Sequence, residues 1–301
     1  MIISASRRTD IPAFYSQWFI NRIRSGFCNV PNPFNARQVS KIDLNANSVD
    51  AFVFWTRYAR PLMPFLKELE TRTFNYYFLY TITGYGQPIE RYNPPVTKSI
   101  TCFKNLSKQM GPKRIIWRYD PVILSSYHNI DYHINKFRQI ASCLKNYTSK
   151  CIISILELYK KTTRRLSFLQ NQGIILDTET KTDPLTRKLL IELNKIAKEN
   201  KIAVFSCAQE VDYSDIGILP GRCIDNELLS QLFPGTDFEN KKDTGQRKNC
   251  GCVKSRDIGM NNSCLFGCRY CYATVSHKVA KKNRFENHFY DSPSLLGWHG
   301  T

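Results

Sequence analysis

The sequence predicts an α/β fold, a parallel and at least partial βα barrel of the TIM type. Short apolar runs alternate with stretches of helical pattern, which calls for βαβ units. The apolar runs are nearly continuous, as expected for strands covered on both faces. Each run becomes polar at its carboxyl end. The six predicted strands are IISASRRTD (2–10), AFVFWTR (51–57), YYFLYTITGY (76–85), RIIWRYDP (114–121), CIISILELY (151–159) and IAVFSCAQE (202–210).

Helical patterns separate most of these strands. Helices are predicted at 11–26, 61–70, 97–111, 131–146 and 183–200. Near the C-terminus, SRDIGMNN (255–262) is expected to supply one further strand, 272–289 a helix that closes the barrel, and DSPSLLGW (291–298) a docking tail. The predicted organisation is one integrated domain with barrel units at 1–215, a cysteine-containing connector at 216–254 and the last strand, loop, helix and tail at 255–301.

Composition and charge narrow the class of protein. A chain of 301 residues with 42% hydrophobic and 13% aromatic content can bury a large core. It shows no secretory signal and no run of eighteen apolar residues, so we expect a cytoplasmic protein with no membrane partner. The formal charge of +18 favours an anionic partner, such as a nucleic acid or nucleotide.

Polar residues follow the predicted strands where a parallel barrel carries its chemistry. Strand ends are polar in any fold because they meet water, but Arg, Thr and Asp recur here and can bind carboxylate, amine and ribose groups. The expected mouth residues are Arg7, Arg8, Thr9, Asp10, Thr56, Arg57, Thr81, Thr83, Tyr85, Arg118, Asp120, Glu157, Gln209 and Glu210.

The eleven cysteines are unevenly distributed. Four are scattered singly and are interpreted as buried thiols, whereas the other seven all lie in the last third of the chain. Cys264, Cys268 and Cys271 have the spacing C-x3-C-x2-C, with Gly267 allowing a tight bend. Three thiolates on a four-iron cluster leave one iron open to an external ligand. A structural zinc site would instead require four protein ligands.

The stretch CLFGCRYCYA resembles the cluster loop of the radical S-adenosylmethionine superfamily, C-x3-C-x-aromatic-C. This resemblance implies a [4Fe-4S] cluster on Cys264, Cys268 and Cys271, with S-adenosylmethionine on the open iron. It further implies reductive cleavage to a 5′-deoxyadenosyl radical that abstracts hydrogen from a substrate, and a reducing partner of the flavodoxin or ferredoxin type. The enzyme would be oxygen-sensitive.

Within that superfamily the chain is most similar to spore photoproduct lyase and its relatives. The similar segments are CRYCYA, SRRTDIPAFY, FWTRYARPL, YTITGYGQPIERYNPP and WRYDPVIL, in the family's order once reading starts at Cys264 and continues from residue 1. This implies a circular permutation with the cluster-binding strand and loop last. The whole chain also resembles a bacterial family of unassigned function, domain-of-unknown-function family 1848.

The resemblance also suggests cofactor-binding residues. Thr9 and Asp10 take the place of a glycine-rich element that binds the methionine amine, although Gly-Gly-Glu itself is missing. Arg118 is the candidate for the methionine carboxylate. Thr81, Thr83 or Asp120 is the candidate for the ribose, and Tyr270, which precedes the third cysteine, belongs to the same cofactor-binding set.

The four remaining cysteines are Cys207, Cys223, Cys250 and Cys252. They are expected to form a second thiolate site, as an auxiliary [4Fe-4S] cluster or zinc, and the C-x-C spacing favours a cluster. Alternatively, Cys207 at the mouth donates a hydrogen atom, as a cysteine does in spore photoproduct lyase.

The rival function is a non-enzymatic iron-sulfur or zinc-binding module for nucleic acid. Histidines show no ligand spacing, and His128 and His133 are expected to face solvent.

Overall fold

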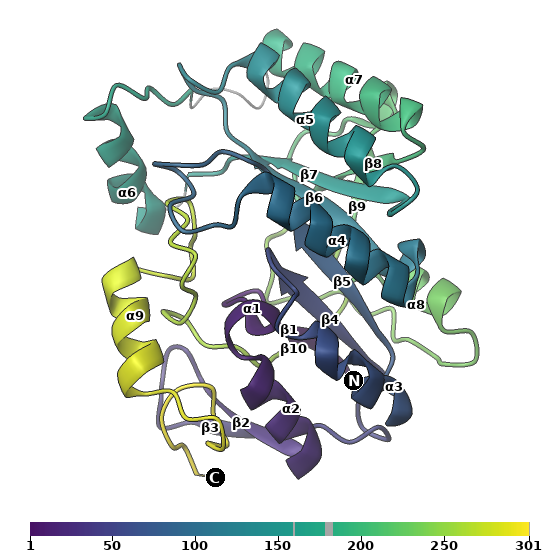
Figure 1. Cartoon of the computed structure of the whole chain (residues 1–301), viewed down its shortest axis with the longest axis vertical. Coiled ribbons are helices and arrows are strands. Elements are labelled where there is room, and N and C mark those ends of the chain that lie inside the picture. Colours follow the sequence, from purple (N-terminus) through teal and green to yellow (C-terminus); the bar gives the residue numbers. More distant parts are fainter. Residues whose placement is uncertain (159, 178–182, 301) are drawn as a thin grey trace.

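The computed structural model describes residues 1–158, 160–177 and 183–300. Its centre is one eight-stranded sheet in which every neighbouring pair of strands is parallel (Figure 1). This arrangement is consistent with a partial βα barrel. From edge to edge the strands are β10 (Arg256–Asp257), β1 (Ile2–Ala5), β4 (Ala51–Thr56), β5 (Tyr76–Thr81), β6 (Ile115–Val122), β7 (Lys150–Ile155), β8 (Ala203–Cys207) and β9 (Leu219–Gly221).

Helices follow the strands along the chain. They are α1 (Ile11–Phe14), α2 (Ser16–Ser25), α3 (Leu66–Thr71), α4 (Val96–Met110), α5 (Ile130–Leu144), α6 (Lys160–Gln170), α7 (Pro184–Glu199), α8 (Asn226–Leu232) and α9 (His277–Glu286), with short 3-10 turns at Met63–Phe65, Pro112–Arg114 and Ser214–Ile216. A separate antiparallel hairpin is formed by β2 (Phe27–Pro31) and β3 (Val39–Asp43).

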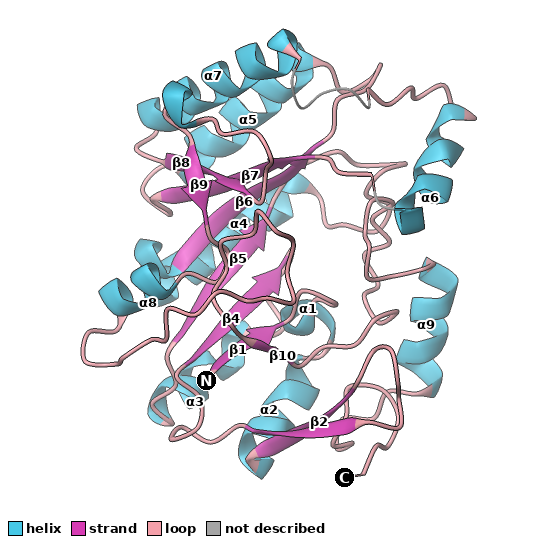
Figure 2. Cartoon of the chain, turned by 180° about the vertical axis from the view of Figure 1, so that it is seen from behind, coloured by secondary structure: helices cyan, strands magenta, loops and turns pink. Residues whose placement is uncertain are grey.

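The two faces of the sheet bury different sets of side chains, because alternate residues of a strand point to opposite faces. Phe52 and Phe54 of β4 belong to the larger core, which the helices α2, α4, α5 and α7 complete. Val53, between them, points to the opposite face of the sheet, which we call the inner face, and belongs to a second core there. Residues 223–253 cover this inner face. Figure 2, which views the molecule from behind, shows loops passing in front of the sheet on this side.

The six strands predicted between residues 2 and 210 are confirmed, each ending within a few residues of the predicted polar tail. Tyr159, at the end of the fifth predicted strand, lies outside the described residues. The predicted helices at 97–111, 131–146 and 183–200 are confirmed as α4, α5 and α7.

Other parts of the prediction differ from the structure. The helix expected at 11–26 is two helices, because the chain leaves helical geometry at Tyr15 (φ −133°) and buries the ring. The segment 61–70 forms a 3-10 turn followed by α3. The hairpin β2–β3 and the short strand β9 were not predicted, since neither has the long apolar run on which the prediction relied.

The C-terminal segments join the fold as predicted. The segment 255–262 contributes β10, which pairs in parallel with β1. The tail docks on α2 and β2: Trp18 Nε1 donates to Ser292 O at 2.9 Å, and Asn29 N donates to Pro293 O at 2.8 Å. Within the described ranges, no helix combines the length and apolar character that a membrane crossing requires.

Candidate functional site

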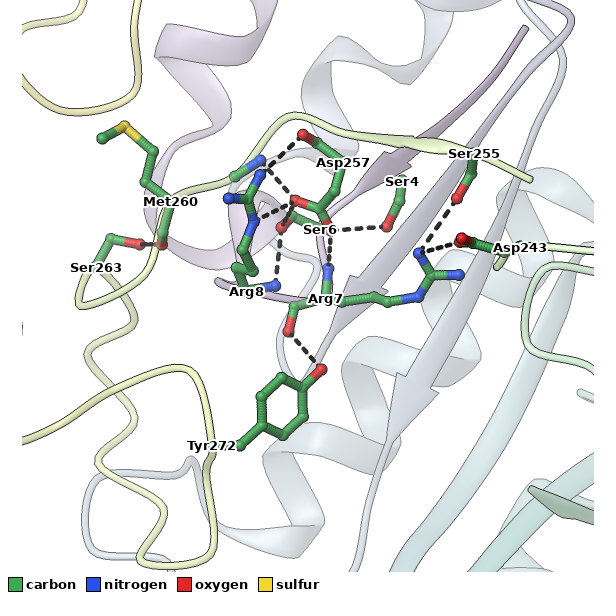
Figure 3. Close-up of polar contacts among 11 residues, drawn as sticks. Ser4, Ser6, Arg7, Arg8, Asp243, Ser255, Asp257, Met260, Ser263 and Tyr272 are labelled. Atoms are coloured by element: carbon green, nitrogen blue, oxygen red, sulfur yellow. Dashed lines mark hydrogen bonds and ion pairs between the residues drawn. The ribbon is translucent and has the colours of Figure 1, made fainter. Parts of the chain in front are cut away.

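The Asp257 carboxylate joins the first loop of the chain to its last strand (Figure 3). It accepts hydrogen bonds from the hydroxyls of Ser4 and Ser6 at 3.1 and 2.6 Å. It also accepts from the backbone amide of Arg7 at 2.8 Å and from Arg8 Nε at 3.1 Å. Residues that lie about 250 positions apart along the chain are thereby held together.

Two further features support this junction. The amide of Gly259 donates to Asp257 at 2.9 Å, and a Cβ at Gly259 would overlap the Ser6 side chain, so only glycine fits this close approach. Tyr272, just after the cysteine loop, donates its hydroxyl to Arg7 O at 3.2 Å (Figure 3). The cysteine loop is thus tied to the carboxyl end of β1.

Asp10 connects the loop after β1 to the end of β4. One carboxylate oxygen accepts from Ala13 N at 2.9 Å, which caps α1, and from the Thr56 hydroxyl at 2.8 Å. The other accepts from Arg57 N at 2.7 Å. Burial raises the pKa of Asp10 to about 7, although these hydrogen bonds and the Arg57 charge oppose the rise. Beside it, the buried Thr9 hydroxyl has no hydrogen-bond partner in the described part of the chain.

A buried ionic network lies under the cysteine loop. Arg57 Nη1 forms an ion pair with Glu90 Oε1 at 2.9 Å and donates to the Thr83 hydroxyl at 3.3 Å. Its Nη2 donates to the Tyr270 hydroxyl. Tyr270 and Thr83 both donate to Glu90 as well. Because a buried ion pair needs further hydrogen bonds to offset desolvation, these two hydroxyls stabilise it.

The cysteine loop itself bends at Gly267, whose φ is +65°, as its sequence predicts. The 82–95 segment holds this loop: Arg269 N donates to Ile89 O at 3.0 Å and Tyr92 N donates to Phe266 O at 3.2 Å. On the other side, Arg165 of α6 donates to the carbonyl oxygens of Cys271 and Thr274. The loop is therefore fixed mainly through its backbone, and of its thiols Cys268 Sγ donates to Asn93 Oδ1 at 3.7 Å.

The three thiols of the loop lie within electrostatic range of one another, and Cys264 and Cys268 also lie within range of Arg57. Burial raises the pKa of Cys268 to about 12, against a lowering by the Arg57 guanidinium. Burial also raises the pKa of Cys264, and Cys271 and Asp10 add to the rise. Asp10 and the cysteine loop thus lie at the same end of the fold.

Arg118 and Asp120, at the end of β6, form an ion pair with each other. Asp120 also accepts from Ser154, and the Arg118 guanidinium lies over the Trp55 ring at 4.8 Å. Its Nε is buried and has no hydrogen-bond partner among the described residues. Thr81 is buried and lies opposite Arg118 in the pairing of β5 with β6.

The remaining cysteines form a second group on the inner face of the sheet. Cys207 ends β8, and its Sγ lies 3.5 Å from Cys223 Sγ. Cys252 lies close enough to Cys223 and Cys250 for both thiols to act on its pKa, and it packs in the same buried cluster. All four side chains are buried. In the described ranges, no group of three or more His, Cys, Asp or Glu side chains is already placed to hold a metal ion.

The structure therefore divides the predicted site residues into connected sets. It brings Asp10, Thr83 and Tyr270 together around Arg57 beside the cysteine loop. Arg118 lies nearer the second group, because its charge lowers the pKa of both Cys207 and Cys223. Two further predicted mouth residues form pairs outside these sets: Glu157 forms an ion pair with Arg247, and Gln209 accepts from Ile155 N at 3.2 Å.

The prediction for two histidines is wrong. His133 is fully buried, with Nδ1 2.9 Å from the Tyr119 hydroxyl and Nε2 3.0 Å from Ile123 O. His128 is buried beside Tyr85 and pairs with Ser125. Desolvation lowers the pKa of His133 to about 4. Both histidines support an aromatic core and lie away from the cysteines.

Two residues central to the site were missed. Glu90 lies in the irregular stretch GQPIERYNPP, where no periodicity distinguishes it from a solvent-facing residue. Asp257 was included only as part of a short predicted strand. Its position directly before Ile258-Gly259, at a strand end like Asp10 and Asp120, was the available signal.

A model of the family described as Domain of unknown function (DUF1848) matches residues 2–273 of the chain. The match includes both cysteine groups and the strand ends around them. No protein of the curated collection matches the sequence.

Proposed function

Because the chain belongs to the DUF1848 family, whose description assigns no activity, we propose a function from the site itself: a radical S-adenosylmethionine enzyme. The observation that carries this proposal is the Cys264, Cys268 and Cys271 loop, held by its backbone at the carboxyl edge of a parallel sheet over a buried arginine. Bound there, a [4Fe-4S] cluster would supply the electron that cleaves S-adenosylmethionine into methionine and a 5′-deoxyadenosyl radical.

The donor set fits such a group in number and charge. Three thiolates from one loop leave a fourth iron without a protein ligand. Arg57 lies close to Cys264 and Cys268, and the two thiols raise the pKa of its guanidinium. A positive charge is therefore fixed beside them. Their side chains would rotate from their present positions, since no described group is already placed to hold metal.

Thr9 and Asp10 are proposed to bind the amine of the cofactor. The buried Thr9 hydroxyl lacks a partner among the described residues, and buried polar groups normally have one. Asp10 accepts three hydrogen bonds, and a carboxylate has about four acceptor positions, so one remains for an ammonium group.

Arg118 is proposed to bind the carboxylate of the cofactor. Its Nε lies buried without a partner in the described chain, and a guanidinium matches a carboxylate in shape and charge. Asp120 holds Arg118 through the ion pair with its Nη2. The ribose is assigned to Thr81 or Thr83, or to Asp120, at the same strand ends. Tyr270 positions the loop by its hydrogen bonds with Arg57 and Glu90.

We further propose that the fold is a circular permutation of the spore photoproduct lyase type. If the sequence is read from β10, the strands of the sheet follow one another from edge to edge in chain order. The strand that precedes the cysteine loop then becomes the first strand. The parallel pairing of β10 with β1 supports this proposal, as does the Asp257 junction between them.

The proposed substrate is an anionic molecule. A charge of +18 suits a nucleic acid or nucleotide. An acidic flavodoxin or ferredoxin is the proposed electron donor, and the exposed lysines of α9, which starts six residues after Cys271, provide the complementary charge.

Anaerobic reconstitution tests the function. Protein loaded with iron and sulfide is incubated with S-adenosylmethionine and dithionite, and 5′-deoxyadenosine is measured by chromatography. We expect its formation in the wild type and its loss in Cys268→Ala, while Cys28→Ser, a buried thiol away from both groups, retains it.

Two results would refute the enzyme. One is a fully loaded wild type that forms no 5′-deoxyadenosine, as expected for a metal-dependent nucleic-acid module. The other is turnover that persists in Cys268→Ala, which would place the reaction elsewhere.

A further inference from the structure

Four cysteines from three separate segments meet on the inner face of the sheet. Cys207 ends β8, Cys223 follows β9 by two residues, and Cys250 and Cys252 precede β10. Because β9 and β10 are the two edge strands, these thiols connect the edges that the parallel ladder leaves apart. The first and last of these cysteines are 45 residues apart along the chain, so the convergence of the three segments comes from the fold.

Their contacts are close and continuous. The Sγ atoms of Cys207 and Cys223 are 3.5 Å apart. Cys250 and Cys252 belong to the same buried cluster as Cys207 and Cys223, and Cys252 lies close enough to Cys223 and Cys250 for the thiols to shift one another's pKa. In addition, Ile224 N donates to Cys252 Sγ at 3.3 Å. An amide that donates to sulfur is the outer hydrogen bond typical of a metal-bound thiolate.

Positive charge surrounds this group. The Arg7 guanidinium lies within electrostatic range of Cys252, and the Arg118 charge acts on Cys207 and Cys223. Each of these guanidinium groups also pairs with a carboxylate, Arg118 with Asp120 and Arg7 with Asp243 at 3.6 Å. Cysteines bind metal as thiolates, and a bound cation would keep all four ionised.

We propose that these four cysteines bind a single zinc ion as a closed tetrathiolate site that ties the two edges of the sheet together. Tetrahedral zinc with Zn–S bonds of about 2.3 Å places its sulfurs about 3.8 Å apart, near the spacing of Cys207 and Cys223. In a four-iron cluster each cysteine binds a different iron, so the sulfurs are spread around the cluster rather than in mutual contact.

Binding requires modest rearrangement. The four cysteine side chains must turn toward one shared zinc position, because no group of described residues is already placed to hold a metal. Each thiol still protonated releases its proton to water as zinc binds. Cys207 then serves as a metal ligand, which excludes it as a hydrogen-atom donor.

This inference is independent of the proposed radical chemistry, and metal analysis separates the two. The triple variant Cys264→Ala/Cys268→Ala/Cys271→Ala removes the loop ligands and isolates the second group. We expect one zinc per chain by mass spectrometry in this variant and in the wild type. Replacement of zinc by cobalt should give the intense charge-transfer and d–d absorption of a tetrahedral thiolate site.

Single variants assign the ligands. Cys252→Ser in the same background should reduce zinc at least tenfold, whereas Cys28→Ser should leave it at one per chain. If Cys252→Ser does not fold, titration of the folded wild type with a mercurial should release one zinc as about four thiols react.

Three outcomes would overturn the inference. Four irons in the triple variant would show an auxiliary cluster instead. An absence of metal after growth and reconstitution with zinc, with four thiols open to alkylation in the folded protein, would show free cysteines. Retention of zinc by the folded Cys252→Ser variant would place it elsewhere.

Discussion

The two cysteine groups differ in how the chain assembles them. Cys264, Cys268 and Cys271 lie within eight residues of one loop, so their spacing alone predicted a site. The second group comes from the ends of β8 and β9 and from the segment before β10, and only the sheet brings its members together. The local group has three thiols, which would leave one iron of a cluster open. The distributed group has four thiols, the number that a closed tetrahedral site requires.

The largest predicted effect is a reciprocal loss of metal. Cys268→Ser should lose iron and retain zinc, because its thiol belongs to the loop, whereas Cys252→Ser should lose zinc and retain iron. Iron and zinc are counted per chain after anaerobic reconstitution. If either variant lost both metals while folded, the two groups would be one coupled site and the comparison would fail.

The next effect concerns the charge under the loop. Arg57→Met should destabilise the protein by about 3 to 5 kcal/mol, because it leaves Glu90 buried without its cation. Urea unfolding measures the loss. The control is the exposed Arg24–Glu68 pair, where Arg24→Met should cost much less, because water screens the pair. Equal losses of unfolding free energy in the two variants would show that the buried Arg57–Glu90 pair contributes no more stability than an exposed ion pair.

The junction between the chain ends should have a smaller effect. Asp257→Asn removes the charged acceptor shared by Ser6, Arg7 and Arg8, and should cost about 2 kcal/mol of unfolding free energy. Hydrogen exchange should increase in residues 2–8 and 257–263 together. Exchange that increased on only one side would indicate that Asp257 does not hold the two segments together. Asp212→Asn, on the exposed surface, serves as the control.

The smallest effect is a pH dependence from Asp10. Burial raises its pKa to about 7 in the folded state, well above the ordinary 3.8, so the folded protein binds a proton that the unfolded chain has lost. Stability from this group is full below the ordinary pKa and is lost as pH rises toward 7 and above.

Between pH 6 and 7 we expect a loss of about 1 kcal/mol relative to Asp10→Asn. Urea unfolding of the two proteins at both pH values measures the difference. Parallel pH profiles would show that Asp10 is ionised throughout this range. The exposed Asp131→Asn variant should follow the wild-type profile.

Sequence patterns predicted the parts of the fold that depend on local periodicity. The six strands and α4, α5 and α7 follow from apolar spacing, and the docking tail from its composition. Periodicity did not reveal the break at Tyr15, where a buried ring and the bond from its hydroxyl to Ser263 O override helix continuation. It also missed the hairpin β2–β3, whose strands are partly exposed.

For the site, the sequence identified residue types but not their partners. The loop cysteines and the strand-end Asp10 and Arg57 were predicted correctly as neighbours at one end of the fold. Glu90 was missed because its role depends on a side chain more than thirty residues away. The contacts within the second group depend on the same long-range packing, so no spacing rule could distinguish a cluster from a single ion.

The most direct test of the account is electron paramagnetic resonance of the reduced, iron-loaded protein with and without S-adenosylmethionine. If Cys264, Cys268 and Cys271 hold a cluster with one open iron, addition of S-adenosylmethionine should shift the g values of the signal. A loaded cluster whose spectrum is unchanged by saturating S-adenosylmethionine would contradict the account.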